Sequence, residues 1–300
     1  MRAVVVSTFG GPEAVRVVET RVPEPGAGQI RIRVAAAALN PVDAGVREGV
    51  FGGGSGEWLG LGWDVAGTVD AVGGDGGSGG SGWAVGDDVV ALVYGTVKPL
   101  GTHAEYVVVD AGAVAKAPAG VDAVHAATVP LNALTAAQAL DLLEVVPGRS
   151  LLVTGAAGAV GGYAVQLAAH RGIEVTALAR EADGELLRSL GAARLAGADE
   201  GGFDAVLDAA VLGEPALARV RDGGAYAGVI PGAHPAPVRG VRTAAVEVSA
   251  DGERLAELVG LVEKGVLTLR VAGTYALEEA AEAHARLAGG GVRGRLVLVP

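Results

Sequence analysis

The spacing of hydrophobic positions changes along the chain near residue 121. Before that point, short valine-rich runs are bounded by Gly, Pro and Asp residues, a pattern typical of β-strands joined by turns. The runs that fit it are Ala3–Ser7, Ile30–Ala35, Gly67–Val72, Asp88–Leu92 and Ala104–Val109. A Gly/Ser-rich tract at Gly73–Gly82 is expected to form a flexible loop between two of these strands. We therefore predict a β-rich domain over residues 1–121.

From about Val121, helical and extended periods alternate. The predicted helices and strands follow one another at His125–Leu143, Leu151–Thr154, Ala159–Arg171, Glu174–Leu178, Gly184–Leu190, Ala205–Ala209, Pro215–Arg221 and Ala225–Ile230. This β-α-β rhythm predicts a parallel sheet covered by helices on both faces. The fold class is therefore α/β, with a doubly wound Rossmann domain expected over residues 122–249.

The last fifty residues return to a mixed pattern. The predicted elements are a helix at Gly252–Lys264, an extended segment at Thr268–Tyr275, a helix at Glu278–Ala288 and a strand at Arg295–Val299. A strand that ends the chain needs a sheet to join. We expect residues 250–300 to fold back onto the N-terminal β-rich domain.

A glycine-rich turn stands between the first strand and the first helix of the expected Rossmann domain. In Gly155-Ala-Ala-Gly158-Ala-Val-Gly161, one glycine makes the turn, the next admits a pyrophosphate, and the last lets the helix pack on the strand. The spacing alone is weak in a chain with 50 glycines among 300 residues, but its strand–turn–helix context predicts a dinucleotide site. The residues expected to contact the cofactor here are Gly155, Ala156, Gly158, Ala159, Val160 and Gly161.

The composition disfavours two classes of protein, those that span a membrane and those that bind nucleic acids. No apolar run approaches the roughly 18 residues of a membrane span, and Met1–Ser7 resembles a first strand rather than a signal peptide. The net charge of −11 disfavours a nucleic-acid surface. We expect a soluble, cytoplasmic protein with neither a membrane nor a nucleic acid as partner.

Cysteine is absent from the chain. Its absence excludes disulfides, thiol nucleophiles and zinc sites built on thiolates. The five histidines are scattered, with no pair at helical ligand spacing, so each is expected to be a surface or packing residue. The sequence predicts no metal site.

Nine blocks of sequence, in order along the chain, resemble the zinc-free, quinone oxidoreductase-like branch of the medium-chain dehydrogenase/reductase family. The blocks are Met1–Glu13, Ala38–Asp43, Gly62–Gly67, Gly86–Val90, Ala104–Val108, Leu134–Ala136, Gly155–Gly161, Leu187–Ala192 and Gly294–Leu298. The resemblance implies a chaperonin-10-like catalytic domain (residues 1–121 and 250–300), a Rossmann domain (residues 122–249) and a cofactor in the cleft between them. Zinc-dependent members carry a Cys near the position of Asn40 and His-Glu in place of Trp63-Asp64, so metal-polarised alcohol oxidation is not expected.

The end of the second Rossmann strand indicates which cofactor is bound. NAD enzymes usually hold an acidic residue there for the ribose 2′-OH, whereas this strand ends at Ala179 and is followed by Arg180, which can pair with a 2′-phosphate. NADPH is therefore expected, although Glu181 keeps NADH open. Thr135 matches a family position near the nicotinamide, where it either bonds the cofactor or caps a helix. Ile230 and Arg295 complete the expected cofactor contacts.

Without a metal or a thiol, hydride delivery from the cofactor must carry the reaction, and its natural acceptors are conjugated. The resemblance implies that the Asn-Pro-Val-Asp motif reaches the cofactor cleft, so Asn40 is expected to bond the nicotinamide ribose or the substrate carbonyl, or else only to form the turn before Pro41. Asp43 either relays a proton or fixes the next helical turn. Tyr94 is a candidate pocket wall or proton donor, and its Tyr-x-x-x-Lys spacing to Lys98 is interpreted as a coincidence with short-chain dehydrogenases.

The leading hypothesis is an NADPH-dependent reductase of quinones or α,β-unsaturated carbonyls. Its alternatives are an enoyl reductase that tailors a polyketide intermediate and a non-catalytic NADPH-binding protein. The resemblance also suggests a homodimer through edge strands of the Rossmann sheets, for which the apolar segment Val241–Val248 is the candidate edge.

Overall fold

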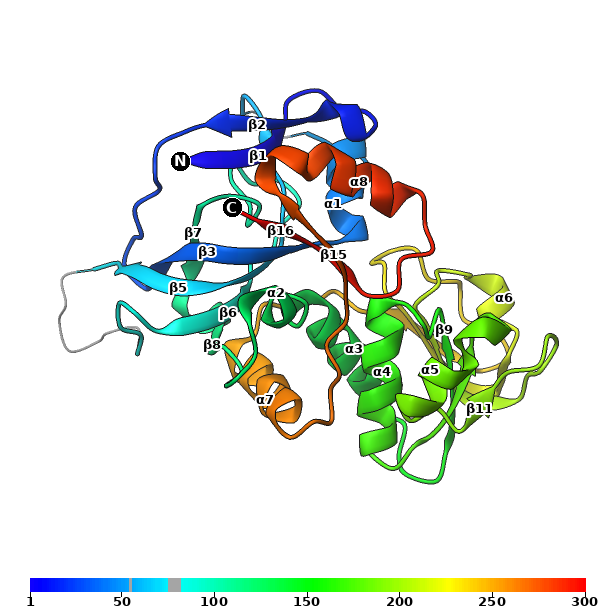
Figure 1. Ribbon diagram of the computed structural model, residues 1–300. Helices are drawn as coiled ribbons and strands as arrows, with labels where there is room; N and C mark the ends of the chain where they lie inside the picture. The colour runs from blue at the N-terminus through cyan, green and yellow to red at the C-terminus, as the bar shows by residue number, and fades with distance from the viewer. Residues whose placement is uncertain (54–55, 75–81) are drawn as a thin grey trace. The chain divides into compact units, whose positions relative to one another are not determined.

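The computed structural model describes residues 1–53, 56–74 and 82–300 (Figure 1). Most of the Gly73–Gly82 tract, for which a flexible loop is expected, lies outside the described residues. By its contacts the chain divides into two compact units. Unit 1 holds residues 1–131, 250–263 and 269–300, and unit 2 holds residues 132–249 and 264–268. Residues 122–131, expected in the Rossmann domain, are thus part of unit 1.

Unit 1 is built from two sheets. A three-stranded antiparallel sheet has the order β2 (Val15–Glu19), β1 (Arg2–Val6), β4 (Leu59–Gly60). The seven-stranded sheet has the order β15 (Val271–Ala276), β16 (Arg295–Val299), β3 (Gln29–Leu39), β5 (Asp64–Val72), β6 (Asp88–Leu92), β8 (Val114–Lys116), with β7 (Tyr106–Asp110) also paired to β3. Because β16 pairs antiparallel with β3, the C-terminal tail joins the sheet of the N-terminal segment, as expected.

Side-chain alternation along β3 shows how this sheet forms its core. Ile30, Ile32 and Val34 are buried, whereas Arg31 and Arg33 between them are less so. Successive side chains of a strand point to opposite faces, so this alternation gives the sheet an apolar face and a polar face. Short helices complete unit 1: α1 (Pro41–Glu48), α2 (Ala123–Ala126), α7 (Gly252–Glu263), α8 (Ala280–Ala288) and the 3-10 turns η1 (Pro12–Ala14), η2 (Ala111–Ala113) and η4 (Leu277–Glu279).

Unit 2 contains a six-stranded, all-parallel sheet. Its order is β11 (Arg194–Leu195), β10 (Glu174–Leu178), β9 (Ser150–Thr154), β12 (Phe203–Asp208), β13 (Val220–Gly228), β14 (Arg242–Ala245). Numbered within the sheet, the order is 3-2-1-4-5-6, that of the dinucleotide-binding Rossmann fold. The helices of this segment are α3 (Pro130–Leu143), α4 (Ala159–His170), α5 (Gly184–Ser189), α6 (Glu214–Leu217) and the turn η3 (Glu181–Asp183). The predicted parallel sheet is confirmed.

Two predicted helices differ from the structure. The helix expected over His125–Leu143 is two helices, because α2 ends at Ala126 and α3 begins at Pro130. Proline has no N–H group and favours the first turn of a helix, so it starts a new helix here. The helix expected over Pro215–Arg221 is only α6, since β13 already begins at Val220. In the part of the chain that the structure describes, no helix combines the length and apolarity needed to cross a membrane.

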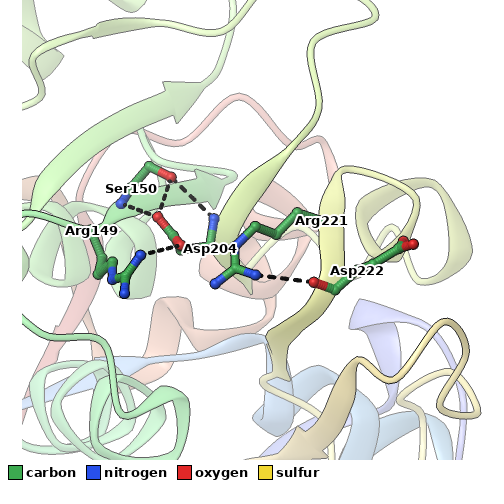
Figure 2. A network of polar contacts seen from close by, with 5 residues as sticks. All are labelled: Arg149, Ser150, Asp204, Arg221 and Asp222. Carbon is green, nitrogen blue, oxygen red and sulfur yellow. Dashed lines mark hydrogen bonds and ion pairs between the residues drawn. The ribbon is translucent and has the colours of Figure 1, made fainter.

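Asp204 holds together the amino ends of three strands of the parallel sheet (Figure 2). Its carboxylate accepts hydrogen bonds from the backbone N of Ser150 at 2.9 Å, from Ser150 Oγ at 3.0 Å and from Arg221 Nε at 2.8 Å. Arg149 adds an ion pair at 3.5 Å. The backbone hydrogen bond from Ser150 is the largest influence that lowers the pKa of Asp204 to about 2. This network lies at the edge of the sheet opposite to the glycine-rich turn.

Candidate active site

The glycine-rich turn has the geometry that its spacing predicts. Gly155 follows β9 with a φ of +56°, a conformation that side chains rarely adopt. Gly158 is the N-cap residue of α4, and its backbone N donates to the carbonyl oxygen of Gly155 at 2.8 Å. A Cβ at Gly161 would lie 2.3 Å from that same oxygen, so only glycine lets the helix approach the strand this closely. Strand, turn and helix therefore form one compact cradle.

The start of α4 is the part of this cradle where a phosphate group would bind. No side chain caps the helix at Gly158, and its first turn contains no acidic residue. The positive end of the helix dipole thus meets no carboxylate from its own first turn. The six residues proposed as cofactor contacts, Gly155, Ala156, Gly158, Ala159, Val160 and Gly161, all belong to this strand–turn–helix segment. A helix N-terminus of this kind suits a phosphate group.

A buried polar network, which sequence reasoning missed, lies directly beside the cradle. Asp208, at the carboxyl end of β12, accepts hydrogen bonds from Thr154 Oγ1 at 2.6 Å, Tyr226 OH at 2.8 Å and the backbone N of Gly213 at 2.8 Å. Thr154 Oγ1 in turn accepts from the backbone N of Ala210 at 3.0 Å. Burial first, and then Asp208, raise the pKa of Tyr226. The network joins β9, β12 and β13 where the strand order of the sheet reverses, the usual ligand position in such folds.

The remaining candidate cofactor contacts of unit 2 differ in their exposure to solvent. Arg180 follows β10, the neighbour of β9, and is exposed; within the described residues no hydrogen bond or ion pair engages its guanidinium group. Glu181 beside it begins η3. Thr135 is buried on α3, and Ile230, two residues beyond β13, is 43% exposed. A free guanidinium group at this strand end is what a 2′-phosphate requires.

Three unit 1 candidates come together in one buried cluster. Asn40 is the N-cap residue of α1, and its backbone N donates to Asp43 Oδ2 at 2.8 Å. Asp43 Oδ1 accepts from the backbone N of Gly62 at 2.7 Å, so both of its carboxylate oxygens are engaged by backbone N–H groups. Arg295 Nη1 donates to Asn40 Oδ1 and to the carbonyl oxygen of Leu39, both at 3.3 Å. The structure thus connects Asn40, Asp43 and Arg295.

Asp64 is the member of this cluster that sequence reasoning missed. Its Oδ2 accepts from Asn40 Nδ2 at 2.6 Å, and its Oδ1 accepts from the backbone N of Leu131 at 2.5 Å. Burial raises the pKa of Asp64 to about 7, against the opposing effects of both hydrogen bonds and of Arg295, while Asp43 raises it further. A lone acid inside the apolar run Trp63–Ala66 was the available signal. The cluster therefore contains a group that titrates near neutral pH.

Tyr94 and Lys98 meet at a third side chain, Trp63. The Tyr94 ring lies edge-on to Trp63 with centroids 5.3 Å apart and is half exposed. The ammonium group of Lys98 lies 4.7 Å from the centroid of the Trp63 ring and donates to the carbonyl oxygen of Val93 at 2.9 Å. Burial lowers the pKa of Lys98 to about 8, although the carboxylates of Asp43 and Asp64 oppose this effect. The Tyr-x-x-x-Lys spacing thus places both groups against one ring.

The described residues contain no group of three or more His, Cys, Asp or Glu side chains that could hold a metal ion. His103 is buried, and its Nε2 lies 3.1 Å from the carbonyl oxygen of Ala38. His284 is also buried and contacts Arg47 Nη1 through Nδ1 at 3.1 Å. Both histidines therefore pack inside unit 1.

Comparisons with known proteins agree with this architecture. Residues 26–119 match the alcohol dehydrogenase GroES-like domain, which confirms the expected chaperonin-10-like domain, and residues 187–298 match the family described as zinc-binding dehydrogenase. The chain is 32% identical to the chloroplastic NADPH-dependent alkenal/one oxidoreductase of Arabidopsis thaliana, covering 100% of this chain and 80% of the relative.

Solved structures extend the likeness to the whole fold. The quinone oxidoreductase of Coxiella burnetii is 28% identical with a TM-score of 0.85, over 100% of this chain and 99% of the other. A mycobacterial protein complexed with NADPH is 28% identical with a TM-score of 0.86, over 100% of both chains. The chain belongs to the medium-chain dehydrogenase/reductase family, in its quinone oxidoreductase-like branch.

Proposed function

We propose that this protein is an NADPH-dependent reductase that transfers a hydride to a quinone or an α,β-unsaturated carbonyl compound without a metal ion. The observation that carries the proposal is the glycine cradle at β9–α4 together with the guanidinium group of Arg180 at the end of β10, which is exposed and unpaired among the described residues. The names of the alkenal/one oxidoreductase and of the quinone oxidoreductase support the substrate class.

The residues of unit 2 fit NADPH. The glycines at 155, 158 and 161 let strand, turn and helix pack closely, and no side chain caps α4 at Gly158, so the start of this helix suits a phosphate. Arg180 is proposed to bond the 2′-phosphate, with Thr135 and Ile230 near the nicotinamide. Bound there, the cofactor supplies a hydride. The protein must then orient the acceptor, exclude water and stabilise the negative charge that develops on the carbonyl oxygen.

Residues of unit 1 are proposed to serve the substrate. The Asn40 amide donates to Asp64 and to the carbonyl oxygen of Ala38 and accepts from Arg295, so these three partners hold it in one orientation. Both carboxylate oxygens of Asp43 accept hydrogen bonds from backbone N–H groups, those of Asn40 and Gly62. Asp43 is proposed to hold the backbone at Asn40 in place. Tyr94, half exposed against Trp63, is proposed as a wall of the acceptor site.

A panel of acceptors tests the function. Purified protein is mixed with NADPH or NADH and with menadione, methyl vinyl ketone or a crotonyl thioester, with and without EDTA. We expect oxidation of NADPH by the quinone or the enone, unchanged by EDTA. Tight NADPH binding without turnover of any acceptor would instead support the non-catalytic alternative, and turnover of the thioester alone would support the polyketide-tailoring reductase.

A homodimer through β14 also belongs to the proposal. β14 is the outer strand of the parallel sheet, next to β13, and it falls within Val241–Val248. An edge strand has unpaired backbone groups on one side, so two copies can pair there. Sedimentation of the wild type and of Thr243→Pro tests this pairing, because proline removes a backbone donor. The expected cytoplasmic location stays a prediction.

A further inference from the structure

Lys98 differs in its surroundings from the two other lysines of the chain, Lys116 and Lys264, which are both exposed. Its ammonium group is held between the ring of Trp63 at 4.7 Å and the carbonyl oxygen of Val93 at 2.9 Å, while the residue keeps part of its surface exposed. An ammonium group has three donors. Within the described residues only the bond to Val93 engages them, so Lys98 has donors to offer to a ligand.

We infer that Lys98 is a catalytic residue: its ammonium group bonds the carbonyl oxygen of the acceptor and supplies the proton that accompanies hydride transfer. This inference rests on the proposed function and adds the proton donor to it. It also changes the interpretation of the Tyr94–Lys98 spacing, because the lysine, not the tyrosine, is the acid.

The other titratable groups near Lys98 are less suited to this role. Asp43 and Asp64 are fully buried, and each uses both carboxylate oxygens as hydrogen-bond acceptors inside the cluster. His103 is fully buried, and its Nε2 contacts the carbonyl oxygen of Ala38. Lys98 alone in this described cluster combines an acidic proton, an accessible surface and a positive charge.

The step balances with one proton. Hydride adds to the β-carbon of an enone, the C=C electrons move to form the enolate, and the enolate takes a proton from Lys98. A quinone takes the hydride and one proton to become a hydroquinone. Lys98 is left as a neutral amine, which regains a proton from water. One hydride, which carries two electrons, leaves the reduced cofactor, and with the proton from Lys98 the acceptor gains two hydrogens in total.

The local electrostatics suit a donor that works near neutral pH. The carboxylates of Asp43 and Asp64 favour the charged lysine, whereas burial disfavours it and prevails, which lowers the pKa of Lys98 to about 8. A nearby His103 has its own pKa lowered, chiefly by burial, and so faces Lys98 as a neutral ring. A general acid is most effective when its pKa lies near the working pH.

Four variants test the role of Lys98. Lys98→Met keeps the length of the side chain without its charge, Lys98→Arg keeps the charge without a transferable proton, and Lys98→Ala makes room for a small amine. Lys116→Met is the matched control for the loss of one exposed lysine. We expect Lys98→Met and Lys98→Arg to lower kcat about 100- to 1,000-fold, the usual contribution of a general acid, with an unchanged Kd for NADPH. Lys116→Met is expected to keep wild-type kcat.

Two further readouts separate catalysis from structure. The wild-type kcat is expected to fall as the pH rises through about 8, and this decline is expected to be absent from both low-activity variants. Added ethylammonium is expected to restore turnover to Lys98→Ala, which a purely structural lysine would not allow. Wild-type kcat in Lys98→Met, or full activity in Lys98→Arg, overturns the inference alone. A wild-type protein that reduces no acceptor overturns the proposed function and the inference with it.

Discussion

The side-chain amide of Asn40 donates a hydrogen bond of 2.6 Å to the carboxyl group of Asp64, and neither side chain is accessible to solvent. The carboxyl group is shared between this amide and the backbone N of Leu131. An acid buried in this way is harder to ionise in the folded than in the unfolded chain. The ionisation state of Asp64 therefore makes the stability of this buried cluster depend on pH.

The first prediction concerns stability near neutral pH. The folded-state pKa of Asp64, about 7, lies above its unfolded value of 3.8, so its favourable contribution is fully present below pH 3.8 and is lost as the pH rises through 7. The loss amounts to roughly 4 kcal/mol at most. Asp64→Asn cannot ionise, so its free energy of unfolding relative to wild type is expected to rise between pH 5 and pH 8.

Urea unfolding of both proteins at the two pH values measures this change. The buried histidines His103 and His284 have lowered pKa values and impose the opposite slope, but they are present in both proteins and cancel. A difference between wild type and variant that stays constant from pH 5 to pH 8 would show that Asp64 does not titrate in this window.

The second prediction concerns acid stability. Asp204 has a lowered pKa of about 2, so its contribution is present above pH 3.8 and is lost as the pH falls through 2. Asp204→Asn is expected to cost about 1–2 kcal/mol at pH 7 and less at pH 3. Asp222→Asn is the control, because this exposed carboxylate makes a surface ion pair with Arg239, and its loss is expected to cost less than about 0.5 kcal/mol. Equal costs for the two variants would contradict the role given to the network in Figure 2.

The parallel sheet could be predicted from sequence because its signals are local. Apolar runs such as Leu151–Thr154 and Glu174–Leu178 agree with β9 and β10, and the three glycines mark the turn that follows. The break before α3 was not predicted, although Pro130 marks it in the sequence. Short edge strands such as β11 and β14 carry too few residues to show a period of two.

The buried polar clusters around Asp64 and Asp208 could not be predicted, because they depend on how the strands pair and at which register. Asp64 meets Asn40 only because β5 pairs antiparallel with β3, which brings together residues 24 positions apart. In the same way, Asp208 meets Thr154 through the parallel pairing of β12 with β9. The hydrophobic pattern predicts a sheet but does not give the register at which two strands pair. Asn40 and Asp43 were predicted because they lie in the Asn-Pro-Val-Asp block that resembles the family.

The third prediction concerns the support of the glycine cradle. Asp208→Ala would leave Thr154, Tyr226 and Gly213 without their shared acceptor, so the turns that follow β9 and β12 are expected to lose their fixed positions. We expect NADPH binding to weaken about tenfold or more, together with a loss of about 2–3 kcal/mol in stability. Tyr226→Phe removes one donor and leaves the other two in place, so its effect on both quantities is expected to be smaller. Cofactor titration by fluorescence and thermal melting measure the two quantities. An unchanged Kd for NADPH in a destabilised Asp208→Ala would show that the network only stabilises the sheet.

The fourth prediction concerns the choice between NADPH and NADH. Arg180 is exposed and, among the described residues, unpaired, so its guanidinium group can form charge-assisted bonds to a 2′-phosphate without giving up existing ones. Arg180→Ala is expected to weaken NADPH binding about 10- to 100-fold and to change NADH binding less than about threefold, since NADH lacks the phosphate. Arg188→Ala, which removes an exposed positive charge from α5, is the control for the general loss of charge. The two dissociation constants are measured for each variant at one ionic strength. If Arg180→Ala keeps the wild-type ratio of the two constants, or if Arg188→Ala changes it equally, Arg180 does not recognise the 2′-phosphate.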